Sequence, residues 1–139
     1  MEEADIIKDL LVDNWNSDNT GTITPVIDLI VNRSNVDVRA NDFILIYNTG
    51  AGPVSHSGVR TFSHMWSVSI DLRTVLFTRY KLYIAEIKRI IGGKYLSPSN
   101  DYHRLYIIRD TDLSDKKRGM YRRVIDVQIT QDLEEVTSI

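Results

Sequence analysis

The chain has 139 residues, 42% of them hydrophobic, which suffices for one domain with its own core. Its 17 basic and 19 acidic residues leave a net charge of -2, so no global attraction to nucleic acid or a membrane surface is expected. Without cysteine, disulfides and thiolate metal sites are excluded, which fits a reducing compartment. The acidic start is unlike a signal peptide and no apolar run could span a bilayer, so we expect a single soluble domain over residues 1–139.

The first third of the chain predicts one helix and two strands. Residues 2–15 place apolar side chains at helical spacing behind several carboxylates, which predicts an amphipathic helix. Ile23–Val31 is rich in β-formers but contains Pro25, so we expect a strand that begins after the proline or lies at a sheet edge. Five consecutive apolar residues in Asp42–Asn48 predict a strand buried on both faces.

The next segment, Thr49–Arg60, reads TGAGPVSHSGVR. Its three glycines, its proline and its lack of periodicity predict a long loop. Loops of this length usually have a function. Because the glycines give this loop conformational freedom that it cannot offset by itself, we expect it to be mobile in the isolated chain and ordered by a partner. Its candidate contact residues are Gly50, Gly52, Pro53, His56 and Arg60.

The segment Thr61–Arg73, TFSHMWSVSIDLR, organises the chain. Its even positions are apolar apart from His64, and its odd positions are polar apart from Met65. This period of two predicts a long strand with one face on the core and the other wet or facing a partner. Such a strand should be central in an antiparallel sheet. We expect its neighbours to be Asp42–Asn48, His103–Asp110 and Gly119–Gln131.

A second amphipathic helix is predicted over Phe77–Ile91, ended by Gly92 and Gly93. Lys94–Tyr102 is expected to be a loop, followed by a hairpin of the last two strands. We expect four side chains to be buried together where the second helix crosses the sheet: Trp66, Ile70, Ile87 and Ile125.

Together these elements predict one α+β domain, similar to an α/β sandwich. A mainly antiparallel mixed sheet of four to five strands should be flanked by the N-terminal helix and the second helix. The polar turn Asp112–Arg118 is expected to be mobile until a partner orders it, and the acidic tail Asp132–Ile139 to be flexible.

Asp71, Glu86 and Lys88 are the residue types of a metal-dependent nuclease, in which two carboxylates hold a cation and a lysine supports the nucleophile. In such enzymes the Glu-x-Lys pair lies on a strand, whereas here it falls in a predicted helix, where residues two apart point about 200° apart. We keep the nuclease as an alternative and predict a protein that is not an enzyme.

The histidines suggest no metal site. No acidic residue is placed to complete a ligand set with His56, His64 and His103. We therefore predict no metal or cofactor.

The concentrated basic patch is Lys116–Arg123. Its charge density suits phosphate contacts, so a small DNA-binding accessory protein is a second alternative. No aromatic residues interleave with the basic turn and three aspartates lie beside it, which favours a solvated hairpin tip or an edge within an oligomer. The candidate contact residues here are Lys116, Lys117, Arg118 and Arg122.

The order of elements resembles that of a known family. An N-terminal helix, DFILIYNTG, a glycine-rich loop, VSIDLRT, YIAEIKRII, YHRLYIIRDTDLSD and RRVIDVQI follow one another as in the tail-terminator (tail-completion, neck) proteins of long-tailed viruses of bacteria and archaea. The resemblance covers Ile6 to Ile129 and is one of pattern, without a catalytic signature.

The resemblance implies a helix-flanked, mainly antiparallel sheet and a structural role. Members of the family assemble as rings, commonly hexamers, that cap the tail tube and present a surface to the head connector. The implied partners are copies of the same chain, the tail-tube protein and a head-connector or head-completion protein. DNA would only pass through the ring lumen, and no membrane is involved. The expected location is the tail or neck of a virion, assembled in the host cytoplasm.

Overall fold

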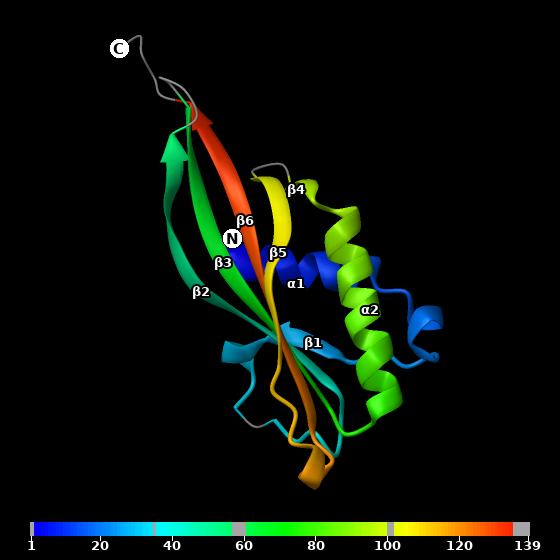
Figure 1. The fold of residues 1–139 in the computed structure, drawn as a ribbon. Coiled ribbons are helices and arrows are strands. Elements are labelled where there is room, and N and C mark those ends of the chain that lie inside the picture. Colours follow the sequence, from blue (N-terminus) through cyan, green and yellow to red (C-terminus); the bar gives the residue numbers. More distant parts are fainter. Residues whose placement is uncertain (1, 35, 57–60, 100–101, 135–139) are drawn as a thin grey trace.

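The structure, a computed structural model, describes residues 2–34, 36–56, 61–99 and 102–134; for residues 51–56, 61–63 and 132–134 it describes the backbone alone. The described residues form two α-helices, α1 (Glu3–Asn14) and α2 (Phe77–Gly93), three 3-10 turns and one six-stranded mixed sheet (Figure 1). The strands are β1 (Val26–Leu29), β2 (Phe43–His56), β3 (Thr61–Thr74), β4 (Leu96–Ser99), β5 (Tyr102–Asp112) and β6 (Tyr121–Glu134). The 3-10 turns are η1 (Ser17–Thr20), η2 (Ile30–Asn32) and η3 (Lys116–Arg118). The predicted α+β class is confirmed, with six strands instead of four to five.

The sheet has the order β1-β2-β3-β6-β5-β4, with β3 in its interior as predicted. β3 pairs antiparallel with β2 on one side and with β6 on the other, from Thr61 opposite Glu134 to Thr74 opposite Tyr121. The prediction that His103–Asp110 adjoins β3 is wrong, because β6 turns back from β5 and occupies that place. β1 begins after Pro25, as predicted, and pairs in parallel with β2 at the sheet edge.

The segment Lys94–Tyr102, which was expected to be a loop, contains β4. This strand has four residues and is joined to β5 by the register pairs Leu96 with Arg104 and Ser99 with Tyr102. A strand this short, with Pro98 inside it, has too few positions to show a period in the sequence.

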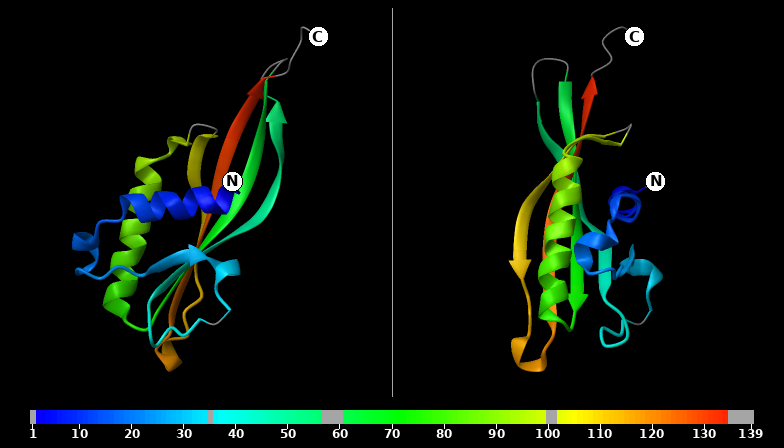
Figure 2. Two further views of the ribbon diagram at one scale, coloured as in Figure 1. Left: turned by 180° about the vertical axis from the view of Figure 1, so that it is seen from behind. Right: turned by 90° about the vertical axis from the view of Figure 1, so that its right-hand side faces the viewer.

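Both helices lie on one side of the sheet, and the main core lies between the two layers (Figure 2). Ile70, Ile87 and Ile125 are fully buried in this core, as predicted, while Trp66 is partly buried at its margin. α1 agrees with its predicted range. α2 includes both of the glycines that were expected to end it, and the N–H of Lys94 then closes the helix on the carbonyls of Ile90 and Ile91.

The prediction of a loop over Thr49–Arg60 is wrong for its first eight residues, which continue β2. Their pairing with β3 shifts register between Asn48 and Gly50 and again between Pro53 and Ser55. These shifts accommodate residues that ordinarily disfavour a strand. Residues 57–60, which include the candidate Arg60, lie outside the described residues.

Three strands extend past the helices at one end of the sheet, in all views of Figures 1 and 2. We call this extension the arm, formed by residues 49–56 of β2, 61–65 of β3 and 131–134 of β6, the last of which lie beyond the register pairs of β6 with β5. β6 continues to Glu134, so the first three residues of the predicted flexible tail are strand; residues 135–139 lie outside the described part.

Candidate functional site: a groove on the helix-free face of the sheet

The second face of the sheet is covered by neither α1 nor α2, and we call it the helix-free face. Because strand side chains alternate, the odd positions of β3 and the even positions of β6 lie on it. One groove of about 490 Å³ lies on this face, with polar lining residues that include Tyr47, Thr49, Ser67, Ser69 and Asp126. A second hollow of about 270 Å³ shares Leu113 and Arg122 with it and is bordered by Val36 and Val38 from the β1–β2 connection.

A buried ionic cluster lies under this groove. Asp71 is fully buried and accepts two hydrogen bonds from Arg122, from Nε at 3.0 Å and from Nη2 at 2.8 Å. Arg73 donates two more, from Nε at 3.3 Å and Nη2 at 3.0 Å. The hydrogen bonds to Asp71 raise the pKa of the Arg122 guanidinium. Two guanidiniums against one carboxylate leave this cluster one positive charge in excess.

The polar face of β3, expected to be wet or to face a partner, is in part covered by the chain itself. Ser69 is 3% exposed and donates a hydrogen bond to Asp126 of β6, and Asp71 is sealed by the two arginines. Ser67, nearer the arm, is partly exposed and lines the groove. Of Ser67, Ser69 and Asp71, Ser67 is therefore the one that remains accessible to a partner.

The β5–β6 hairpin adds exposed apolar side chains to the helix-free face. Four of its large hydrophobic residues are 40–50% exposed: Tyr106, Ile108, Leu113 and Met120. Ile108 lies at the register shift between Ile107 and Arg109, and it lines the groove. Tyr106 donates a hydrogen bond of 2.6 Å from its hydroxyl to Gln128. Apolar side chains beside polar ones in a shallow groove are typical of a surface that contacts another protein.

The predicted basic patch Lys116–Arg123 is not one surface. Lys116, Lys117 and Arg118 are exposed at the tip of the hairpin, whereas Arg122 lies in the groove with Asp71. Arg123 is on the opposite, helix-covered face, where it binds Asp110 and holds the pKa of that carboxyl below its usual value. This separation arises because successive strand residues point to opposite faces.

The hairpin tip, residues 112–120, is built by its own hydrogen bonds. The Asp112 carboxylate accepts the N–H of Ser114 at 2.9 Å, and Asp115 pairs with Met120 through their backbones. Gly119 then turns the chain at φ 66°, a left-handed conformation that suits glycine. Hydrogen bonds within the tip therefore hold its conformation. The mobility expected for it in the free chain stays a prediction.

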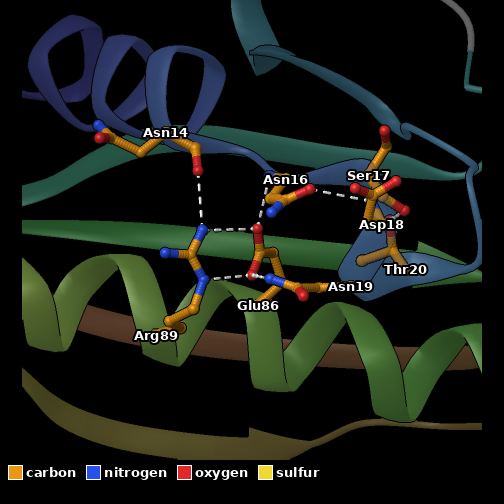
Figure 3. Close-up of polar contacts among 8 residues, drawn as sticks. All are labelled: Asn14, Asn16, Ser17, Asp18, Asn19, Thr20, Glu86 and Arg89. Carbon is orange, nitrogen blue, oxygen red and sulfur yellow. Dashed lines mark hydrogen bonds and ion pairs between the residues drawn. The ribbon is translucent and has the colours of Figure 1, made fainter.

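The nuclease residues are not brought together. Asp71 lies on the helix-free face, while Lys88 of α2 pairs with Asp110 at 2.6 Å on the other. Figure 3 shows Glu86 pointing from α2 toward the segment that follows α1. Its carboxylate accepts the Asn16 N–H at 2.7 Å and two hydrogen bonds from Arg89 at 2.6 and 2.8 Å.

These contacts, and a further hydrogen bond from Asn19, lower the pKa of Glu86 to about 2, with the Arg89 hydrogen bond as the largest cause. Arg89 also donates to the carbonyl of Asn14 at 2.8 Å, which ties α2 to the end of α1. Glu86 is thus a buried carboxylate that joins α2 to the segment after α1 and holds Arg89 in place against the end of α1.

The predicted arm residues lie on a strand. Gly50, Gly52, Pro53 and His56 belong to β2, and their register partners on β3 are Ser67, Met65, His64 and Phe62. The His64 ring stacks on Trp66 with ring centroids 6.0 Å apart. Within the described ranges, no group of three His, Cys, Asp or Glu residues could hold a metal ion.

Sequence reasoning missed most of the groove. Tyr47, Arg109 and Asp126 meet there only through the strand register. The signal that the sequence did contain was the run of polar odd positions in β3.

Compared with known proteins, the chain matches no family model and no curated protein. No helix in the described part is long and apolar enough to cross a membrane.

Proposed function

We propose that this chain is a structural assembly protein of the tail-terminator kind, a subunit of a ring that caps the end of a tail tube and joins it to the head connector. The observation that carries the proposal is the helix-free face, where a groove of about 490 Å³ is bordered by exposed apolar side chains in a single copy of the chain. The order of elements along the sequence supports the family, and the two helices on one side of a mainly antiparallel sheet agree with it.

A protein face of this composition favours burial against another protein. Ile108 and Leu113 lose unfavourable contact with water when they are covered, and the serine and threonine side chains beside them are desolvated at low cost. The arm adds strands that no helix covers, so a subunit offers two extended surfaces for partners. Both features suit contacts with partner proteins, and neither requires a catalytic reaction.

The proposed contact elements are the arm and the hairpin tip. On the arm they are Gly50, Gly52, Pro53 and His56, together with Arg60, which lies outside the described residues; on the hairpin they are Lys116, Lys117, Arg118 and Arg122. We assign them to neighbouring copies in a ring, commonly of six, to the tail-tube protein and to a head-connector or head-completion protein. In this proposal DNA passes through the lumen, the ring belongs to the virion neck and is assembled in the host cytoplasm, and neither a cofactor nor catalysis is involved.

Light scattering coupled to size exclusion tests the proposal, on the free chain and on the chain mixed with tail-tube protein. A hexamer has six times the 16.0 kDa of the chain, about 96 kDa. Ile108→Asp should abolish the ring and the capping of tubes, because it places a charge in the contact surface. Leu82→Asp, at a similarly exposed residue of α2, is the matched control. A chain that stays monomeric with and without tube protein overturns the proposal.

A further inference from the structure

The two surfaces that the sheet offers differ in charge. The groove on the helix-free face is lined by Arg109 and Arg122, and the excess positive charge of the Asp71 cluster lies beneath it. The arm ends in the last residues of β6, where the sequence carries Asp132 and Glu134. An acidic strand end and a basic groove on one molecule are complementary.

We propose that the groove of one copy receives the acidic end of β6 from a second copy. This inference rests on the proposed function, since it names the contact that would join ring neighbours. The groove and the Asp71 cluster beneath it hold Arg73, Arg109 and Arg122 against Asp71 and Asp126, three positive charges and two negative. Asp115, which lines the second hollow, is paired with Arg118 at 3.5 Å. An incoming carboxylate balances this sum and accepts charge-assisted hydrogen bonds from the arginines.

The groove has room and donors for such a carboxylate. The Arg122 side chain is 39% exposed even though it binds Asp71, and Arg109 is exposed. Ser67, Thr49 and Tyr47 also line the groove and supply hydroxyl groups. Ile108 and Leu113 at the border offer apolar contact to the rest of the arriving strand.

The end of β6 cannot fill the groove of its own chain. Asp132 is paired with Ser63 and Glu134 with Thr61, so this end is held within the same sheet that forms the groove floor. Glu134 also lies eight residues along β6 from Asp126, about 27 Å in a strand. Only another copy can bring its arm over the groove.

A contact between unlike surfaces has a consequence for symmetry. In the proposed ring each copy gives its arm to one neighbour and receives the arm of another, which makes the contact heterologous. Two copies that exchange arms with each other would form a two-fold dimer instead, and the measured mass of the complex distinguishes this dimer from a ring. Heterologous contacts close into rings when the rotation between copies allows it, which is the kind of assembly that a tube cap requires.

Charge reversal with rescue tests the contact. Arg109→Glu makes the groove acidic, and the pair Asp132→Lys with Glu134→Lys makes the arm basic; each variant alone should weaken self-association about tenfold or more. An equimolar mixture of the two variants should restore self-association. The acidic groove of the first variant then receives the basic arm of the second, and the basic groove of the second receives the acidic arm of the first. Lys94→Glu, an exposed charge reversal at the end of α2, should leave association unchanged.

Sedimentation velocity at low and high salt measures the association, and a melting curve verifies that each variant is folded. Folded variants that associate like the wild-type chain overturn the contact and leave the proposed function intact, and so does a mixture that fails to recover association. A wild-type chain that does not associate overturns the proposed function and the contact with it.

Discussion

At the scale of single residues, Glu86 makes stability depend on pH. Its pKa is lowered to about 2 in the folded chain, against an ordinary value of 4.5. A carboxyl with a lowered folded pKa contributes its stability above about pH 4.5 and loses it as the pH falls toward 2. The contribution at neutral pH is at most about 3 kcal/mol. Glu86→Gln should therefore lower the free energy of unfolding most at neutral pH, and the gap from wild type should close near pH 2.

Urea unfolding of both proteins from neutral pH down to about pH 2 measures this gap. Asp13→Asn, which removes an exposed carboxylate at the end of α1, is the control. A gap for Glu86→Gln that is equal at all pH values contradicts the assignment of the low pKa to the Arg89 and Asn16 contacts.

Replacing glycine by alanine should change the stability of the fold in opposite directions at two positions. Gly119 has a φ of 66°, where a side chain is strained, so Gly119→Ala should destabilise the fold by about 1 kcal/mol. Gly50 lies in β2 without a left-handed φ, and no heavy atom lies within 4 Å of the Cβ it would gain. Gly50→Ala should therefore raise stability by about 0.4 to 1 kcal/mol, because the unfolded chain loses freedom. Thermal melting of the two variants measures the pair; a melting temperature lowered equally by both would show that Gly50 needs the freedom of a loop glycine.

At the scale of elements, the attachment of α2 to the sheet depends on Ile87. This side chain is fully buried in the core between the helices and the sheet. Ile87→Ala should cost about 2 to 5 kcal/mol in the free energy of unfolding, since it leaves a cavity between the two layers. Leu82→Ala, at a residue of α2 that is 41% exposed, should cost much less. A cost below about 1 kcal/mol for Ile87→Ala contradicts this packing.

Periodicity predicted the two helices and β3 well, because these elements are long and half-buried. It failed for residues 49–56, where glycine and proline favoured a loop. Pairing with the long β3 overrides that local preference, and two register shifts absorb the misfit. Strand β4 escaped prediction for the opposite reason, since four residues carry no measurable period.

The groove could not be predicted from local sequence patterns, because they do not show which strands pair or in what register. Asp71 and Arg122 are 51 positions apart, and only the pairing of β3 with β6 brings them into contact. The polar odd positions of β3 marked the face without identifying its partners. Likewise, the run Lys116–Arg123 suggested one basic patch until strand alternation divided it between two faces and a tip.

At the scale of the whole molecule, the arm should respond to assembly. β1 pairs with β2 only from Phe43 to Ile46, so within the described residues the outward amides of β2 beyond Ile46 have no strand partner. These amides, and those of residues 131–134 at the end of β6, should exchange with solvent faster in the free chain than in the proposed ring. Hydrogen exchange by mass spectrometry measures the difference, with β3 around Ile70, paired on both sides, as the reference. Equal exchange of the arm in both states contradicts its role as a contact element.

The position of β6 also bears on how the chain folds as it is made. β6 follows every other strand in the sequence, yet it lies between β3 and β5. Sixty residues separate the end of β3 at Thr74 from the end of β6 at Glu134, which ribosomes synthesise in about 3 to 12 s. During that interval the nascent chain exposes strand edges on β3 and β5 that other chains could pair with. We therefore expect the nascent chain to be most prone to pairing with other chains until β6 has emerged and closed the sheet.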